Sequence, residues 1–193
     1  MNKDLLIQFL QTGGIASHAI AVEIAEKFQH KTIIKNQPQL VEGKVCDEYL
    51  FLEQGFMRAF AHDTEGAEVT TNLFSPGQMV FEVSSFFNRT RSKENIVALT
   101  DCAGWYITFA ELNGLFHSLP QFREFGRSVL VKGFAEFKNR ALSMITETAE
   151  ERYATLLKTN PEIFQHAALK HIASYLGVTD TSLSRIRKEF SKK

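Results

Sequence analysis

The sequence predicts an α+β fold: an N-terminal jelly roll (a double-stranded β-helix), one long helix, and a small winged-helix-like C-terminal domain with two helices joined by a turn. Short apolar runs separated by turn residues recur between residues 31 and 108, which is typical of β-sandwiches and jelly rolls. Apolar residues between 121 and 148 recur at helical spacing. Residues 168–193 contain two short amphipathic patterns with a glycine between them.

The N-terminal part begins with helical patterns and continues as strands. Two short helical patterns within residues 5–28 are separated by Gly13 and Gly14, and Ser17 is a good N-cap for the second. The predicted strands, which are apolar runs bounded by turn residues, cover residues 47–55, 56–61, 69–74, 96–100 and 103–108. We expect most of the 17 Phe side chains in the core and interfaces of this domain.

The pattern over residues 121–148 predicts one long helix with an apolar stripe. The steps along the stripe alternate between four and three residues, as in the heptad seam of a coiled coil. The seam residues are Leu130, Phe134, Phe137, Ala141, Met144 and Thr148. Such a seam predicts a homodimer, with packing of the helix against its own domain as the alternative.

The pattern at the end of the chain predicts two helices that cross at a tight turn. Gly177 can adopt the left-handed conformation that ends a helix, and Thr179 is a good N-cap for the helix that follows. The small side chain of Ala173 allows the second helix to cross the first closely. This spacing is typical of a helix-turn-helix, with an ordinary pair of antiparallel helices as the alternative.

The second of these helices presents polar and basic side chains on its outward face. Such groups can reach bases and phosphates, so this face predicts binding to double-stranded DNA. The candidate DNA-binding residues are Thr179, Thr181, Ser182, Ser184, Arg185, Arg187 and Lys188. Arg185 is the best candidate for a contact with a guanine edge.

Charge is distributed unevenly along the chain. The sequence has 22 basic and 22 acidic residues, but six Lys or Arg residues stand against two acids from His166 onward. The C-terminal segment therefore carries a net charge of +4 and the rest of the chain −4. A basic segment on an acidic body fits a small footprint on nucleic acid, although a solvated basic tail has the same composition.

Several function classes lack support in the sequence. No apolar run approaches eighteen residues and Met1 opens no secretory leader, so we expect a cytoplasmic protein without a membrane partner. Cys46 and Cys102 are far apart and the six His residues are scattered, so we expect no metal site. We find no nucleophile elbow, metalloprotease motif or P-loop and expect no catalytic residues.

The order of these parts resembles the Crp/Fnr superfamily of transcription regulators over nearly the whole chain. The resemblance is carried by 49-YLFLEQG-55, by 76-PGQMVFE-82 at the entry to the phosphate-binding cassette, and by 172-IASYLGVT-179 with 183-LSRIR-187. It implies a homodimer that reads an inverted repeat, with RNA polymerase as a further candidate partner. The implied domains are residues 1–120 (cyclic nucleotide-binding-like sensor), 121–148 (dimerisation helix) and 149–193 (helix-turn-helix).

The cassette departs from the pattern of the family's cyclic-nucleotide-binding members. Phe81 stands where the pattern has the glycine before Glu82, and Ser92 stands ten residues after Glu82, where the family carries an arginine. A one-residue shortening would instead bring Arg91 and Ser92 into register, and Arg89 lies nearby. The implied effector pocket is Glu82, Arg89, Arg91 and Ser92. No cofactor is certain from this pattern; a cyclic nucleotide or another small anionic effector is the candidate, with cAMP disfavoured.

The DNA-reading segment departs as well. Many relatives carry a Glu in the first turn of the recognition helix, and Thr181 occupies that position here. The operator is therefore expected to differ from the family's commonest one. The alternative function is a small-molecule sensor or protein-interaction module that no longer reads DNA sequence.

Overall fold

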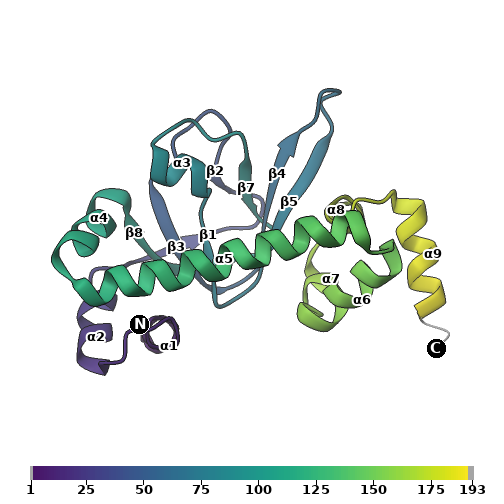
Figure 1. The fold of residues 1–193 in the computed structure, drawn as a ribbon. Helices are drawn as coiled ribbons and strands as arrows, with labels where there is room; N and C mark the ends of the chain where they lie inside the picture. Colours follow the sequence, from purple (N-terminus) through teal and green to yellow (C-terminus); the bar gives the residue numbers. More distant parts are fainter. Residues whose placement is uncertain (1, 191–193) are drawn as a thin grey trace.

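A computed structural model describes residues 2–190 of the chain. It shows three parts: a β-sandwich with helices at its ends, a long helix α5 that runs across one side of the sandwich, and a group of short helices beyond the far end of α5 (Figure 1). Mixed α and β structure with a long helix is what the sequence predicted.

Eight strands form the sandwich. They are β1 (Gln29–Ile33), β2 (Pro38–Leu40), β3 (Glu48–Gln54), β4 (Met57–His62), β5 (Glu68–Phe74), β6 (Gln78–Val80), β7 (Asn95–Ala98) and β8 (Cys102–Thr108). They form two antiparallel sheets of four strands, in the orders β1-β8-β3-β6 and β2-β7-β4-β5. The hydrophobic core of the sandwich includes Leu50, Phe51 and Leu52 from one sheet and Met57 and Ile96 from the other.

The turn between β3 and β4 shows why one glycine is required. Gly55 has φ of +89°, and a Cβ on it would lie 2.4 Å from the carbonyl oxygen of Asp101. A side chain would therefore clash with backbone as well as strain the turn. This glycine ends the apolar run that predicted β3.

Four helices that precede α5 in the chain pack around the sandwich. They are α1 (Asp4–Thr12), α2 (His18–Glu26), α3 (Val83–Asn88) and α4 (Phe109–Ser118). The Ser17 hydroxyl accepts from the Ile20 amide at 3.4 Å, as expected of an N-cap, and Gly13 lies between the first two helices. Thr108 and Glu111 form a capping box at the start of α4.

Helix α5 (Pro120–Thr146) is the long helix that the sequence predicted, but it ends two residues early. Thr148, placed on its seam by the heptad pattern, lies outside it. The Thr148 hydroxyl accepts from the Glu151 amide at 3.3 Å, and the Glu151 side chain accepts from the Thr148 amide at 2.8 Å. This capping box begins a new helix and so ends the old one.

The remaining helices are α6 (Ala149–Thr159), α7 (Ile163–His166), α8 (Leu169–Leu176) and α9 (Asp180–Phe190). Their buried side chains, including Tyr153, Ile163 and Ile172, form a second core. Phe56 and Leu73 of the sandwich belong to the same core. The C-terminal helices therefore pack directly against the sandwich in this conformation.

Candidate effector cavity and C-terminal helix pair

Glu82, the acid of the predicted cassette, is the N-cap of α3. Its two carboxylate oxygens accept from the backbone amides of Ser84 at 3.0 Å and Ser85 at 2.6 Å. The Ser85 hydroxyl in turn accepts from the Cys46 amide at 2.8 Å and donates to the Thr90 carbonyl at 2.6 Å. The carboxylate thus stabilises the start of α3 and fixes the cassette backbone.

Arg89 is the C-cap of α3 and has a left-handed backbone, with φ of +55°. Its guanidinium donates to the Cys46 carbonyl at 3.0 Å and to the Asp47 carboxylate at 2.5 Å. It also lies over the ring of Phe109, 4.3 Å from the ring centroid. These contacts stabilise the loop before β3.

Ser92 makes side-chain hydrogen bonds with the local backbone, whereas Arg91 is paired there only through its own backbone. The buried Ser92 hydroxyl donates to the Glu94 carbonyl at 2.8 Å and accepts from the Glu94 amide at 3.0 Å. Arg91 is exposed and forms an isolated backbone bridge with Val45. The four predicted pocket residues therefore lie along one segment, and none of them lines the cavity described below.

Phe81 occupies the position where the pattern of the family has a glycine. Its ring packs edge-on against Tyr49 at a centroid distance of 4.7 Å and against Phe86 at 5.6 Å. Burial of Tyr49 in this aromatic cluster raises the pKa of its phenol well above the usual range. The space that a glycine would leave beside the cassette is filled with aromatic rings.

A cavity of about 260 Å³ opens beside Phe81, between the two sheets. Its apolar wall is formed by Leu40, Val80, Phe81 and Ile96. Its polar wall includes Gln39, Lys44, Asp47 and Glu48. The carboxylate oxygen Oε2 of Glu48 accepts from Lys31 Nζ at 2.5 Å and from Gln39 Nε2 at 2.7 Å.

The C-terminal helix pair, α8 and α9, is joined by the turn that the sequence predicted. Gly177 has φ of +69° and caps α8, and the Thr179 hydroxyl accepts from the Ser182 amide at 3.2 Å. Ala173 and Leu183, both fully buried, lie in the core that the two helices share. Helix α9 is therefore held at a fixed angle to α8.

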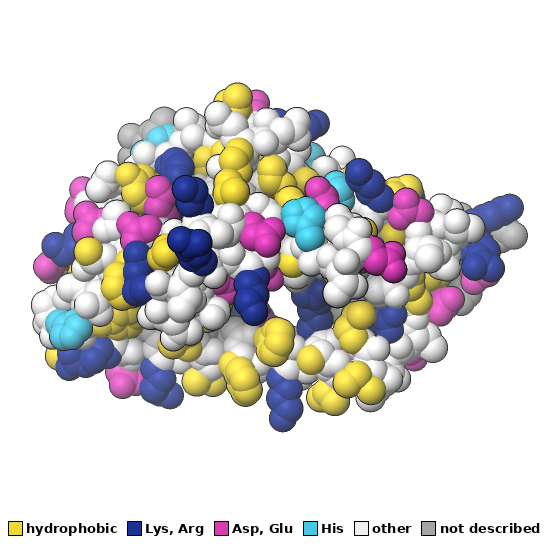
Figure 2. Space-filling view, turned by 90° about the horizontal axis from the view of Figure 1, so that it is seen from above, with side chains coloured by type: hydrophobic (Ala, Val, Ile, Leu, Met, Phe, Trp, Pro, Cys, Tyr) yellow, Lys and Arg dark blue, Asp and Glu magenta, His cyan; other side chains and the backbone are white. Residues whose placement is uncertain are grey.

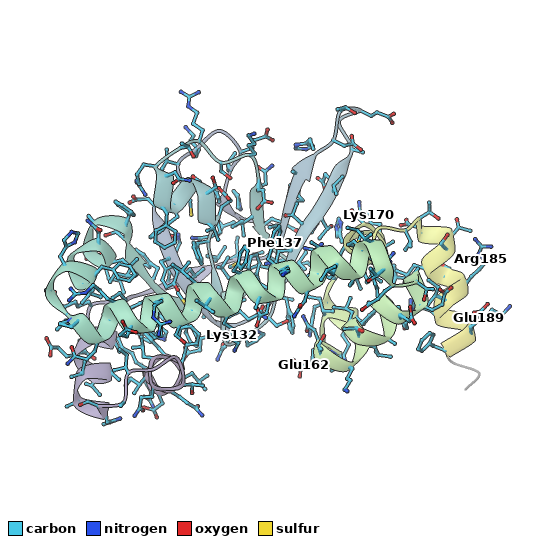
Figure 3. All side chains as sticks on the ribbon, viewed as in Figure 1. Lys132, Phe137, Glu162, Lys170, Arg185 and Glu189 are labelled. Atoms are coloured by element: carbon cyan, nitrogen blue, oxygen red, sulfur yellow. The ribbon has the colours of Figure 1, made fainter. Side chains whose placement is uncertain are left out.

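The predicted polar face of α9 is present in the structure. Its exposed members are Thr179, Thr181, Ser184, Arg185, Arg187 and Lys188, and Ser182 is half-buried beside them. Arg185 points away from the body of the molecule (Figure 3). The Ser184 hydroxyl donates to the Asp180 carbonyl at 2.9 Å, so it is bonded within the helix.

Helix α8 docks on strand β5, a contact that the sequence analysis did not predict. The Thr70 amide donates to the Ser174 hydroxyl at 2.9 Å. Beside it, the buried Arg58 guanidinium binds the Glu68 carboxylate at 2.7 Å and the Thr70 hydroxyl at 2.9 Å. Burial, followed by the nearby positive charge of Arg58, lowers the pKa of His171 on α8 to about 4.

Arg140 connects three elements. It projects from α5 and donates to the backbone carbonyl of Thr71 on β5 and, at 3.4 Å, to that of Tyr175 on α8. Its guanidinium also stacks over the Tyr175 ring, 4.0 Å from the centroid. The long helix is thus tied to both the sandwich and the C-terminal pair.

The middle of α5 exposes large apolar side chains. Phe134 and Phe137 are each 69% exposed, and Leu130 is 47% exposed. Figure 2 shows hydrophobic side chains along the edge of the molecule on which α5 runs. Met144, the last residue of the predicted seam that lies within α5, faces the C-terminal pair, because a Cβ on Gly177 would lie 2.5 Å from its Cε.

Residues 31–118 match the family model of the cyclic nucleotide-binding domain. The matched range contains strands β2 to β8, the last three residues of β1, and helices α3 and α4. No curated protein matches the chain in sequence.

Solved structures of Crp/Fnr regulators share the fold. The c-di-GMP-responsive global regulator CLP of Xanthomonas campestris matches with a TM-score of 0.70 and 15% identity, over 91% of this chain and 92% of that chain. FixK2 of Bradyrhizobium japonicum matches with a TM-score of 0.70 and 16% identity, over 86% and 85%. The catabolite activator protein of Thermus thermophilus matches with a TM-score of 0.57 and 22% identity, over 95% and 87%.

Identities this low establish the fold alone, but the coverage extends the likeness beyond the cyclic nucleotide-binding domain. Two of these three proteins are named for a regulatory role: CLP is a global regulator and the Thermus protein is a catabolite activator. Within residues 2–190 no cluster of His, Cys, Asp and Glu could hold a metal ion. In the same range no helix is both long and apolar enough to cross a membrane.

Proposed function

We propose that the protein is a homodimeric, DNA-binding transcription regulator with an effector-sensing β-sandwich. The observation that carries the proposal is the C-terminal helix pair, in which a buried crossing holds α9 with its polar face outward. This is the arrangement by which a helix-turn-helix inserts its second helix into the major groove. The fold shared with DNA-binding regulators supports the same role.

The side chains on the exposed face of α9 differ in the part of DNA that they can bind. The fork of Arg185 can donate two hydrogen bonds to the O6 and N7 atoms of guanine. Thr181 and Ser182 offer hydroxyl groups that pair with several base edges, so they specify less strongly. Arg187 and Lys188 supply positive charge for the phosphate backbone. Each phosphate contact makes affinity depend on salt through the release of counterions.

Dimerisation through α5 would serve this function. Leu130, Phe134 and Phe137 form an apolar stripe that is exposed in the single chain, and burying it in a second copy is favourable. A two-fold axis along the helix would pair the two α9 helices for an inverted repeat. A regulator of this type acts on RNA polymerase, which we include as a proposed partner.

The sensing part is proposed to respond to a ligand other than a typical cyclic nucleotide. Glu82, Arg89 and Ser92 make hydrogen bonds with the backbone around them, and Phe81 fills the adjoining space. A cyclic phosphate is bound best by a guanidinium that faces it and donates hydrogen bonds to its oxygens. Arg89 instead binds Asp47 and the Cys46 carbonyl.

The test is selection of bound sequences from a pool of random DNA duplexes by the full chain. We expect an inverted repeat to be enriched and its affinity to fall steeply as salt rises. Arg185→Ala should reduce affinity for the selected duplex by roughly 10-fold or more and relax one base position in each half-site. Lys35→Ala, which removes one exposed positive charge from the sandwich, is the matched control and should change affinity less than 2-fold.

The alternative function would appear in the same experiment. A protein that dimerises but enriches no sequence, and whose weak affinity for DNA is the same with and without Arg185, is not a sequence-reading regulator. That outcome would leave a sensor or protein-interaction module.

A further inference from the structure

We infer that the contact between α8 and the sandwich is a proton-sensitive latch, which holds α8 on β5 while His171 is neutral and weakens when His171 takes up a proton. The latch consists of the contacts that His171 and Ser174 make with β4 and β5. Only its consequence for DNA rests on the function proposed above. The latch itself can be tested without DNA.

The geometry of the latch requires a neutral imidazole. Helix α8 lies next to β5 (Figure 1), and the Ser174 hydroxyl accepts from the Thr70 amide at 2.9 Å. One turn earlier on α8, His171 Nε2 lies 3.5 Å from Arg58 Nη1. A guanidinium carries donors only, so this hydrogen bond exists only while Nε2 has no proton. Protonation places two cations in contact and removes the acceptor.

Arg58 cannot move away from an added positive charge. It is 2% exposed, and its guanidinium is held on β5 by the Glu68 carboxylate at 2.7 Å and the Thr70 hydroxyl at 2.9 Å. Among the described residues its Nη2 atom is buried without a hydrogen-bond partner. Charges repel more strongly at a buried site than in water. The repulsion is therefore relieved by movement of α8, which is attached to the sandwich only by side-chain contacts at this point.

Four charged groups from three elements act on His171. Burial and the positive charges of Arg58 and Lys170 lower the pKa of His171 to about 4, and the carboxylates of Glu68 and Asp180 oppose this only in part. The hydrogen bond with Arg58 also lowers the pKa of Glu68, so that carboxylate stays charged in mild acid. Histidine is the one side chain of this set that ordinarily titrates between pH 5 and 7.

The latch should respond to mild acid rather than only near pH 4. Once α8 is released, His171 regains its ordinary pKa of 6.5, so the latch has its full strength above that value and weakens as the pH falls. One pH unit below 6.5, the equilibrium constant for docking should be about 10-fold lower. The contacts of Arg140 with β5 and α8 do not titrate in this range and are unchanged.

Release of the latch would change the position of the reading helix. Helix α9 crosses α8 at a buried contact, so it follows α8 when α8 moves. Glu147 and Thr148 have extended backbones between α5 and α6, and this link can act as the hinge. In a dimer, the two α9 helices would then lose the fixed spacing that an inverted repeat requires.

Hydrogen exchange at the Thr70 amide reports the latch directly, because the partner of this amide, Ser174, lies on α8. The protection of the amide is its exchange rate relative to that of an unstructured amide at the same pH. It is measured on the full chain at about pH 7.5 and about pH 5.5. We expect protection to be roughly 10-fold lower at the lower pH, in proportion to the docking constant.

Two other amides distinguish release from unfolding. The Asn36 amide donates to the Ala98 carbonyl at 2.9 Å within the sandwich. The Val178 amide donates to the Ala173 carbonyl at 3.0 Å within the C-terminal pair. Both should keep their protection within about 2-fold between the two pH values, because neither bond crosses the latch.

Three variants assign the effect to one side chain. His171→Gln stays neutral, so its Thr70 protection should not depend on pH. His171→Lys carries a permanent charge, so it should show the low protection already at about pH 7.5. His166→Gln is the matched control: His166 is exposed and stacks on Phe56 at a centroid distance of 4.2 Å, and a charged imidazole can still stack there. This control should keep the full pH response.

A second measurement needs no variant. Titration of the His171 ring by NMR in the unmutated chain should show that the ring gains its proton as Thr70 loses protection. This result decides the question even if a substitution at position 171 prevents folding. A ring that gains its proton while Thr70 stays protected would contradict the inference.

The inference is also wrong if Thr70 protection is the same at both pH values, if His171→Gln keeps the pH response, or if Val178 loses protection together with Thr70. DNA affinity is measured separately, on the selected duplex. It should fall more in the unmutated chain than in His171→Gln at the lower pH, and an equal fall would refute the effect on DNA. A working latch without DNA selection would refute the regulator proposal alone. DNA selection with pH-independent Thr70 protection would refute this inference alone.

Discussion

The guanidinium of Arg58 on β4 lies 3.5 Å from the imidazole of His171 on α8, measured from Nη1 to Nε2. The two residues are far apart in sequence and belong to the sandwich and the C-terminal pair respectively. Arg58 is almost completely buried and is held by Glu68 and Thr70 on the neighbouring strand. The position of α8 therefore depends on a side chain of the β-sandwich.

Arg58→Leu should destabilise the protein by about 2 kcal/mol, because it removes a buried charged donor from Glu68 and Thr70. Urea unfolding at neutral pH measures the change. Arg127→Leu is the control, since Arg127 forms an exposed ion pair with Glu124 on α5 at 3.0 Å. Its effect should stay within about 0.5 kcal/mol. Equal effects of the two substitutions would show that the buried position of Arg58 contributes nothing.

His171 predicts a loss of stability in mild acid. Its pKa is lowered from 6.5 to about 4 in the folded chain, so the unfolded chain binds a proton more readily between these values. Folding free energy should therefore be fully present above pH 6.5 and decline as the pH falls toward 4. The lowered pKa of Glu68, caused mainly by its hydrogen bond with Arg58, acts below 4.5.

His171→Gln isolates this effect. The variant lacks the titrating group, so its stability should depend less on pH than that of the unmutated chain over the range from 6.5 down to 5. Glu94 is half-buried and has a raised pKa from desolvation, which contributes with the opposite sign in both proteins and cancels in the comparison. Parallel stability curves measured by thermal unfolding would contradict the assignment to His171.

The parts of the fold that the sequence predicts are those encoded by local periodicity. Five of the eight strands, the long helix and the Gly177 turn each follow from neighbouring residues and were found near their predicted positions, whereas β1, β2 and β6 were not among the predicted strands. The capping box of Thr148 and Glu151 was also readable in the sequence, since it needs only a three-residue spacing. The regular heptad steps extended the long helix through Thr148 instead, so the competing local signal was missed.

The candidate site could be predicted only in part. The exposed face of α9 follows from helical spacing, and Arg185 was placed there correctly. The roles of Glu82 and Arg89 could not be read from a motif, because both depend on where α3 begins and ends. The contact between Gln39 and Glu48 carries no sequence signal, since the two residues lie on different strands and Glu48 also binds Lys31 of a third strand. Contacts of this kind depend on the register of the sheets.

Phe137→Asp should convert a dimer to a monomer, because it places a charge in the middle of the apolar stripe of α5. Light scattering at micromolar concentration measures the mass. Lys132→Asp introduces the same side chain at a heptad position opposite the stripe, where it should leave the dimer intact. Lys132 and Phe137 are labelled on α5 in Figure 3. A monomeric unmutated chain would refute the dimer proposal.

Gly177→Ala should destabilise the C-terminal pair for two separate reasons. A left-handed conformation costs a residue with a Cβ about 1 kcal/mol relative to glycine. The new Cβ would also lie 2.5 Å from Met144 Cε, so the end of that flexible side chain must move. Together these effects should lower the free energy of unfolding by about 1 to 2 kcal/mol.

Gly114→Ala should change the free energy of unfolding in the opposite direction. Gly114 lies inside α4, and a Cβ there would meet no atom within 4 Å among the described residues. Alanine should therefore stabilise the protein by about 0.5 to 1 kcal/mol through helix propensity. If Gly177→Ala is instead as favourable as Gly114→Ala, the turn does not require a left-handed residue, and α9 would not be held at the angle on which the proposed DNA reading depends.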